Sequence, residues 1–358
     1  MTWGLAGNRH VVAALRRTLA GRALAHAYLF AGPEHVGKGT LALRLAQALN
    51  CTGEGRGAAG TGATGRSPLP LADSPCGACE PCRRIAGGLH ADVQTVAVEP
   101  SEEGPQHKAI SVGQVREVER AVALNPFEGR WRVVIIDPAD AMTAEAQNAF
   151  LKTLEEPPAH VVFVLVTAHP ERLLPTVRSR CRRLEFRLLS ATAVEEALRG
   201  EGVEPERASL LARLSRGRVG WALAIARDPA QMERRREALA SARALAAMSV
   251  DERMGLAERL AGDFHRDRGA VLSLLGDWLD WWRDVLLIQS GAEEGAANHD
   301  LLGELREDAR RCPQADVQGF VRALILGRRH LEENTQPRLA LEALVLEAPR
   351  AAGAAARR

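Results

Sequence analysis

The chain lacks the features of several broad protein classes. None of its apolar runs reaches the roughly 18 residues that span a bilayer, and its first residues hold no apolar signal-peptide core. Charge of one sign is not in excess, because 47 Lys and Arg face 45 Asp and Glu and leave a net charge of +2. We therefore expect a cytoplasmic protein with at most a local basic face, and neither a membrane protein nor a polycation that coats nucleic acid.

Lysine is scarce in this sequence. Only three of the 47 basic residues are lysines, namely Lys38, Lys108 and Lys152. Because a compact phosphate site prefers a small ammonium to a guanidinium, each lysine marks a position where Arg does not serve equally well. Otherwise the 358 residues, 46% apolar and 26% charged, predict an ordinary globular protein of two to three domains. This balance excludes a mostly disordered chain, a collagen-like chain and a disulfide-rich mini-domain.

The first half of the chain alternates between helical and strand patterns. Leu and Ala spacing predicts helices over 11–19, 41–49, 111–124 and 143–156, and apolar runs predict strands over 26–31, 132–137 and 161–167. This alternation predicts βαβ units and a parallel sheet up to about residue 187. Residues 52–75 are rich in Gly, Ala, Thr, Ser and Pro without periodicity, which predicts a flexible loop or insertion.

The second half shows no strand signal. Residues 190–226 predict a small helical unit, and residues 230–348 predict further helices, with breaks near 291–298 and at Pro313 and Pro337. The predicted fold class is α/β plus all-α, with domains over 1–187, 188–228 and 229–350 and a flexible tail over 351–358. Trp278, Trp281 and Trp282 fall at helical spacing, which indicates either a buried helix face or packing into neighbouring subunits. Arg234–Arg236 is expected on a solvated face.

A phosphate-binding frame follows the strand predicted over 26–31. Gly32 and Gly37-Lys38 form the G-x4-G-K pattern, in which glycines let backbone N–H groups wrap a phosphate at a helix N-terminus. The next position normally carries a Ser or Thr hydroxyl for Mg²⁺, but here it is Gly39, and Thr40 comes one residue late. The alternatives are a working nucleotide site, a P-loop by ancestry alone, or an ordinary glycine-rich turn.

The strand predicted over 132–137 ends in Asp137, as does the strand whose acid helps to hold Mg²⁺ in P-loop proteins. A hydrolysing ATPase of this type usually continues with Glu to activate water, whereas here the next residue is Pro138. Asp140 follows three residues after Asp137 and cannot simply replace that Glu. The alternative interpretation is a buried strand with a capping Asp.

Four cysteines form the pattern C-x24-C-x2-C-x2-C: Cys51, Cys76, Cys79 and Cys82. Three closely spaced thiols and a fourth brought in by a loop suit a structural tetrahedral zinc site. In a reducing compartment, such a cluster indicates a metal before a disulfide. The alternative is a set of free thiols. Cys181 and Cys312 stand apart and are expected to be buried structural residues.

Three further motifs carry a family resemblance. They are the run from Ala149 to Pro158 (AFLKTLEEPP), the polar Thr167 at the end of its strand, and Ser179-Arg180-Cys181. Through these motifs the chain resembles the AAA+ clamp-loader family of bacterial DNA polymerase III. The resemblance implies a RecA-like domain, a sensor role for Thr167, and an arginine finger at Arg180 that enters a neighbouring subunit's ATP site. The alternative for Arg180 is a surface ion pair.

Further segments, with the cysteine cluster, resemble the delta-prime branch of this family: His26–Phe30, Ala46–Cys51, Gly88–Asp92, Ile110–Arg116, Trp282–Leu286 and Asn334–Glu342. This resemblance covers residues 3 to about 347. The gamma/tau branch shares the cysteine cluster and the Ser-Arg-Cys motif, but it would carry an intact G-K-T/S and the acid after Asp137. It would also carry a sensor-2 Arg where this chain has Gly220. Whether Arg216 or Arg218 replaces that Arg is left open.

The resemblance implies a subunit that helps to load the sliding clamp on primed DNA, together with delta and gamma/tau partners. Its expected cofactors are a structural Zn²⁺ and, as an open alternative, ATP or ADP with Mg²⁺. The third domain would be an oligomerising collar. Since three parts of a hydrolytic site are missing or displaced, we expect little or no ATP hydrolysis by the isolated chain. The rival functions are an active gamma/tau-like motor subunit and an adaptor outside replication.

Overall fold

A computed structural model describes residues 3–21, 23–53, 74–98, 109–332 and 336–351. The chain separates into two compact units, Met1–Ala197 with Gly217–Trp221, and Leu198–Arg216 with Ala222–Arg358. The three-domain division stays a prediction. The predicted insertion over 52–75 and the predicted tail fall largely outside the described residues. No helix within the described residues is long and apolar enough to cross a membrane.

The first unit contains the predicted parallel sheet. Its strands are β1 (Ala27–Ala31), β2 (Val93–Val96), β3 (Arg132–Ile136), β4 (Val161–Thr167) and β5 (Arg182–Glu185). They are all parallel and lie in the order β2-β3-β4-β1-β5. Sequence patterns predict the three central strands, which are almost wholly buried, but not the two edge strands, whose residues are mostly exposed or half-buried.

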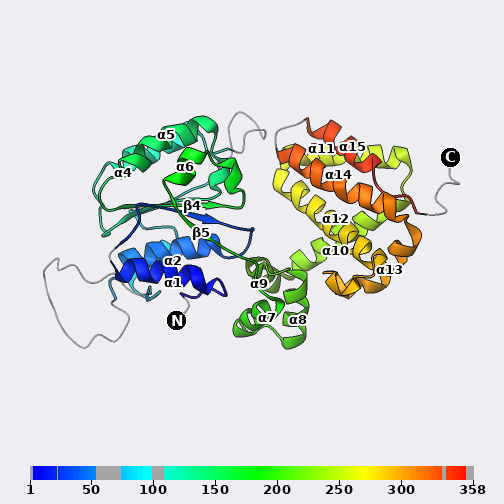
Figure 1. Cartoon of the computed structure of the whole chain (residues 1–358), viewed down its shortest axis with the longest axis horizontal. Helices are drawn as coiled ribbons and strands as arrows, with labels where there is room; N and C mark the ends of the chain where they lie inside the picture. Colours follow the sequence, from blue (N-terminus) through cyan, green and yellow to red (C-terminus); the bar gives the residue numbers. More distant parts are fainter. Residues whose placement is uncertain (1–2, 22, 54–73, 99–108, 333–335, 352–358) are drawn as a thin grey trace. The chain divides into compact units, whose positions relative to one another are not determined.

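Helices cover both faces of this sheet (Figure 1). On one face lie α1 (Arg9–Ala20) and α2 (Lys38–Asn50), and on the other lie α4 (Val112–Val122), α5 (Ala144–Glu155) and α6 (Pro175–Ser179). Each face has its own apolar core, and helix positions spaced three and four apart supply it, as Val11, Val12, Leu15 and Leu19 do in α1. Each such buried side chain stabilises the fold by about 1.5–3 kcal/mol. The short helix α3 (Glu80–Ala86) packs against α2.

The strand order gathers three sequence motifs at one edge of the sheet. The segment after β1 is the G-x4-G-K loop, β3 is followed by Asp137, and β4 ends at Thr167. Since β4 lies between β1 and β3, the carboxyl ends of all three strands meet there. The backbone N–H of Gly32 donates to the Thr167 carbonyl at 3.3 Å, which joins the loop to the neighbouring strand.

At the opposite edge, one buried carboxylate holds the loop before β3. Asp92, 1% exposed, accepts the backbone N–H groups of Phe127, Glu128 and Gly129 at 2.7–2.8 Å, and Nη2 of Arg132 at 2.9 Å. Burial alone would raise the pKa of Asp92, but these hydrogen bonds outweigh it and lower the pKa from 3.8 to about 2. The carboxylate therefore fixes the start of β3 relative to β2.

The rest of the chain is helical, as predicted. The helices are α7 (Ala191–Gly200), α8 (Pro205–Leu214), α9 (Val219–Arg227), α10 (Pro229–Ala244), α11 (Val250–Arg266), α12 (Arg268–Gln289), α13 (Leu302–Arg311), α14 (Gln314–Glu332) and α15 (Pro337–Leu346). In the second unit α12 packs against α10, α11, α13 and α14. Trp278, Trp281 and Trp282 of α12 are fully buried among these helices, which confirms the buried-face interpretation.

The prediction of a solvated face for Arg234–Arg236 is wrong at its middle residue. Arg235 is 7% exposed and forms an ion pair with Asp300 at 3.0 Å and a hydrogen bond with Asn298. Asp284, fully buried in α12, accepts the backbone and side-chain N–H groups of the same Asn298 at 2.7–2.8 Å. The loop between α12 and α13 thus needs a buried arginine, a requirement that local sequence does not reveal.

The hydrogen bonds of the Asp92 carboxylate lead to a first prediction. Asp92→Asn should destabilise the protein by about 2 kcal/mol at pH 7, because the amide replaces one acceptor oxygen with a donor that faces N–H groups. The folded pKa lies below the ordinary value, so the carboxylate contributes its stability above about pH 4 and loses it as the pH falls towards about 2. Urea unfolding of both proteins at pH 7 and pH 3 measures this difference. A stability difference that does not shrink at pH 3 would contradict the assignment.

Candidate functional site

The G-x4-G-K segment forms the predicted loop between β1 and α2. Gly32 and Gly37 have φ values of 144° and 93°, which favour glycine. A Cβ on Gly32 would lie 2.3 Å from the Phe186 carbonyl oxygen, and one on Gly37 would lie 2.6 Å from Leu5 Cδ1. Both glycines are therefore required for the loop to fold against its neighbours. The N-terminus of α2 follows directly, which gives the loop the positive end of a helix dipole.

The ammonium of Lys38 is buried in this loop. Lys38 is 7% exposed, and its Nζ donates to the carbonyl oxygens of Gly32 at 2.6 Å and Pro33 at 2.5 Å. Burial is the main cause that lowers the pKa of Lys38, and the carboxylate of Asp137 opposes it. Burial likewise raises the pKa of Asp137, while Lys38 lowers it. The lysine thus bonds the carbonyl groups of its own loop.

The position that normally supplies the Mg²⁺-binding hydroxyl lies against Asp137. A Cβ added to Gly39 would lie 3.0 Å from Asp137 Oδ2, a distance tighter than ordinary van der Waals contact. Thr40 is exposed in the first turn of α2, and one helical step turns its side chain by about 100° from that of residue 39. Thr40 therefore does not present its hydroxyl where residue 39 would.

Thr167, the expected sensor residue, is 1% exposed and already has partners. Its hydroxyl donates to Asp140 Oδ1 and accepts the backbone N–H of His169 at 2.9 Å. Asp140 also lies close enough to Lys38 and Asp137 to affect the pKa of both groups. Sequence reasoning considered Asp140 only as a substitute for the missing Glu; the structure instead pairs it with the sensor hydroxyl.

At the position expected for a sensor-2 Arg, this chain has a glycine that bonds to the loop through its backbone. Gly220, in the first turn of α9, donates its backbone N–H to the carbonyl oxygen of His35 in the loop at 2.7 Å. A Cβ on Gly220 would lie 2.8 Å from that oxygen, so no side chain fits without moving the loop or the helix. The pKa of His35 is lowered, mainly by partial burial of its ring. The negative charge of Glu34 opposes this shift, and the positive charge of Arg218 adds to it.

Neither alternative for the sensor-2 Arg has a free guanidinium. Arg216 forms ion pairs with Asp280 and, at 3.2 Å, with Asp284, both in α12. The guanidinium carbon of Arg218 lies 5.9 Å from the centre of the Trp221 ring, within cation–π range. These contacts commit both arginines to neighbours within their own units.

Arg180, the expected finger, lies at the C-terminal end of α6 and is held in place. Its side chain is 33% exposed, its Nη1 donates to the Thr176 carbonyl oxygen at 2.8 Å, and its Nη2 forms an ion pair with Glu155. The surface ion pair considered from sequence is therefore present. A guanidinium has five N–H donors, and these two bonds leave three for another group. Glu155 belongs to the Ala149–Pro158 motif, from which no role was predicted for it.

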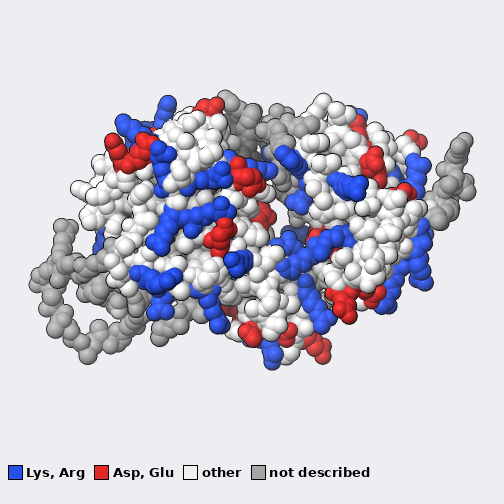
Figure 2. Space-filling view, viewed as in Figure 1, with Lys and Arg blue, Asp and Glu red and all other residues white. Residues whose placement is uncertain are grey.

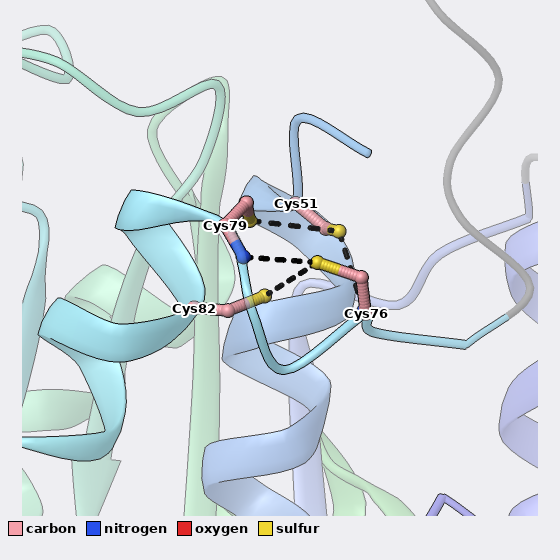
Figure 3. A group of neighbouring side chains, drawn as sticks. All are labelled: Cys51, Cys76, Cys79 and Cys82. Atoms are coloured by element: carbon pink, nitrogen blue, oxygen red, sulfur yellow. Dashed lines mark hydrogen bonds between the residues drawn. The ribbon is translucent and has the colours of Figure 1, made fainter. Parts of the chain in front are cut away.

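The four clustered cysteines come together at the N-terminal part of the sheet unit (Figure 3). Cys51 follows α2, Cys76 lies in the loop before α3, Cys79 is the residue before α3, and Cys82 is within it. Their sulfurs all lie within 4.8 Å of one another, and the pairs Cys76–Cys82 and Cys51–Cys79 are 3.9 Å apart. Four sulfurs at about 2.3 Å from a central Zn²⁺ would be about 3.8 Å apart, so the cluster fits a tetrahedral zinc site.

The surroundings of the cluster also suit a structural metal. Three of the four cysteines are buried and Cys76 is half-buried. Burial raises the pKa of the Cys51 and Cys82 thiols, so that a divalent cation is the group that would hold them as thiolates. The Gln47 side chain donates to the Cys82 carbonyl oxygen at 2.7 Å and ties α3 to α2. Four sulfur ligands leave no open position for a substrate, which is typical of a structural site.

Arginines are concentrated in the stretch around Arg180. From Arg172 to Arg187 the chain carries six arginines and one glutamate. Arg172, Arg182, Arg183 and Arg187 are exposed. Figure 2 shows Lys and Arg side chains gathered on the visible face of the sheet unit, with acidic side chains between them. A positive surface of this kind attracts phosphate groups.

Residues 7–190 match the model of a family described as DNA polymerase III, delta subunit. The chain is 30% identical over 327 residues to DNA polymerase III subunit delta' of Bacillus subtilis, covering 90% of each chain. It is 32% identical over 341 residues to subunit delta' of Pseudomonas aeruginosa, covering 93% of this chain and 95% of that protein. It is also 30% identical to subunit gamma/tau of Mycobacterium bovis over 94% of this chain, but it spans only 58% of that longer protein.

The second prediction concerns zinc binding by the cysteine cluster. Purified protein should contain about one zinc ion per chain, measured by elemental analysis. Cys76→Ser should lower the zinc content and the melting temperature together, because it removes one thiolate ligand. The matched control is Cys181→Ser, which changes a half-buried thiol outside the cluster and should keep the zinc. Metal-free protein whose stability does not change with a chelator would overturn the zinc assignment.

Proposed function

Because the chain belongs to the DNA polymerase III delta-subunit family, as a delta-prime-type clamp-loader subunit of DNA replication, we propose that it acts as a helper subunit. Its own P-loop turns over little or no ATP. Its Arg180 enters the ATP site of a neighbouring subunit and stabilises the charge that develops on the γ-phosphate. The observation that carries this proposal is the contrast between an impaired local site and an intact Ser179-Arg180-Cys181 motif.

Three features of the chain's own site support the lack of turnover there. The Thr167 hydroxyl proton is committed to Asp140, so it is not available to a phosphate or a water molecule. The Gly39 position has no hydroxyl for Mg²⁺, and Asp137 lies against the space where one would be. Pro138 offers no base to activate water. The loss of one part could be compensated, but the loss of all three removes metal support, sensing and base together.

The surroundings of Arg180 support a role outside this chain. Arg180 lies at the end of the short helix α6, and a third of its side-chain surface is exposed. A rigid guanidinium with spare N–H donors is the group that stabilises negative charge on a transferring phosphoryl group. By resemblance, the nucleotide that it serves is bound by the neighbouring subunit.

The proposed cofactor is one structural Zn²⁺ bound by Cys51, Cys76, Cys79 and Cys82. The P-loop residues Gly32, Gly37, Lys38 and Thr40, with Asp137, keep the frame of a nucleotide site, and ATP or ADP with Mg²⁺ is the ligand class that this frame would take. Binding there would stabilise the chain without hydrolysis. Nucleotide binding and turnover are separate properties, and the proposal concerns turnover.

The proposed partners are delta and gamma/tau subunits and, through the assembled complex, the sliding clamp and primed DNA. We place this assembly in the cytoplasm. The helical unit leaves large apolar side chains exposed on α14 and α15: Ile325, Leu326, Leu339 and Leu346. Such surfaces suit contacts with other subunits. The rival adaptor function predicts instead that the chain fails to assemble with these subunits.

The third prediction concerns turnover. The isolated wild-type chain should hydrolyse ATP no faster than the isolated Lys38→Ala variant does, as measured by phosphate release. Gly39→Ser combined with Pro138→Glu is not expected to create activity, since a partner's arginine finger is also needed. Wild-type turnover that disappears in Lys38→Ala would favour the gamma/tau-like motor function instead.

The fourth prediction separates the helper from the motor. In the complex assembled with delta and gamma/tau, Arg180→Ala should lower hydrolysis at one ATP site by on the order of 10³-fold while the variant still assembles and keeps its zinc. Single-turnover hydrolysis and clamp loading on primed DNA measure this loss, because other sites mask it in bulk assays. Lys38→Ala should have a much weaker effect. The matched control is Arg120→Ala, which removes an exposed arginine from α4.

The opposite result for these two variants would contradict the proposed helper function. If Lys38→Ala abolished loading and Arg180→Ala had no effect, the chain would depend on its own nucleotide and not serve that of its neighbour.

A further inference from the structure

Glu155 is the acidic residue that holds Arg180. It is the last residue of α5, and its Oε1 accepts Nη2 of Arg180 in an ion pair. The other anchor of the guanidinium, the Thr176 carbonyl oxygen, belongs to α6 itself. Arg180 is therefore bonded both to its own helix and to a second helix, and these two helices pack against each other on one face of the sheet.

The position of Glu155 is locally unfavourable. The C-terminal end of a helix carries partial negative charge, so that a carboxylate there costs about 0.3–1 kcal/mol at an exposed site. Glu156 adds a second acid at the same helix end, followed by Pro157. The Arg180 guanidinium is the partner that the structure gives to Glu155, and its positive charge offsets this cost.

The geometry of the pair limits what Arg180 can do. A free arginine side chain samples many rotamers, whereas a guanidinium bonded at two of its nitrogens samples fewer. The Thr176 bond alone leaves rotation about the last bonds of the side chain. The Glu155 bond restricts that rotation and leaves three N–H donors for another group.

We propose that Glu155 is a positioning residue for Arg180, which holds the guanidinium in the direction required to reach a phosphate bound by the neighbouring subunit. This inference rests on the finger function proposed above. The gain is one of pre-organisation, because a group held in place before the reaction does not have to be ordered in the transition state. Glu155 itself touches no substrate.

The test compares three single variants in the assembled complex. Glu155→Ala should lower single-turnover ATP hydrolysis by on the order of tenfold, mainly through kcat, since ATP is bound by other groups. Glu155→Gln keeps an acceptor oxygen and should restore most of the rate. The matched control is Glu156→Ala, which removes the neighbouring acid of the same helix end and should leave the rate unchanged. The melting temperature of each variant checks for general damage to the fold.

A double variant tells positioning from an independent effect. When Arg180 is already Ala, Glu155→Ala should cause no further loss, because the group that it orients is gone. An additional loss in that background, a faster rate in Glu155→Ala, or an equal loss in Glu156→Ala would each overturn the positioning role. A silent Arg180→Ala would instead refute the finger function on which the inference rests, and so the two failures are distinguishable.

Discussion

The site depends on the place of β4 between β1 and β3. Parallel pairing on both sides of β4 sets the loop after β1, the acid after β3 and the threonine at the end of β4 beside one another. This edge is where open parallel sheets bind ligands, and a nucleotide-hydrolysing protein would place metal, base and sensor there. In this chain, polar groups at the same edge form hydrogen bonds with one another. Lys38 bonds loop carbonyl groups, Thr167 bonds Asp140, and Gly220 bonds His35.

Those internal bonds explain how a P-loop fold is retained in a chain proposed not to hydrolyse ATP. Buried polar groups need partners: the Lys38 ammonium has the carbonyl groups of its own loop, and the His35 carbonyl group has the N–H of Gly220 at the start of α9. The absence of a side chain at Gly220 gives the room for its bond to His35, since a Cβ there would lie 2.8 Å from the His35 carbonyl oxygen. Arg180 lies apart from that edge, at the end of α6, and its side chain is 33% exposed.

The sequence predicted what depends on local pattern. Three central strands, the long helices and the cysteine cluster follow from apolar periodicity and ligand spacing, and the structure confirms them. The edge strands β2 and β5 were missed because exposed strands lack an apolar run. Long-range partners were missed as well: Asp140 for Thr167, Glu155 for Arg180, and Asn298 with Asp300 for Arg235. Such pairs join residues about 25–65 positions apart, and only the tertiary fold brings them together.

The most direct test is a structure of the complex assembled with delta and gamma/tau subunits, primed DNA, and ADP with beryllium fluoride as a γ-phosphate mimic. The account predicts that Arg180 donates to the γ-phosphate mimic bound by the neighbouring subunit, while its Nη2 stays bonded to Glu155. It also predicts that Thr167 still donates to Asp140 in this chain. A structure in which Arg180 is remote from every nucleotide, while Lys38 and Thr167 bind a γ-phosphate mimic in this chain's own P-loop, would contradict the account.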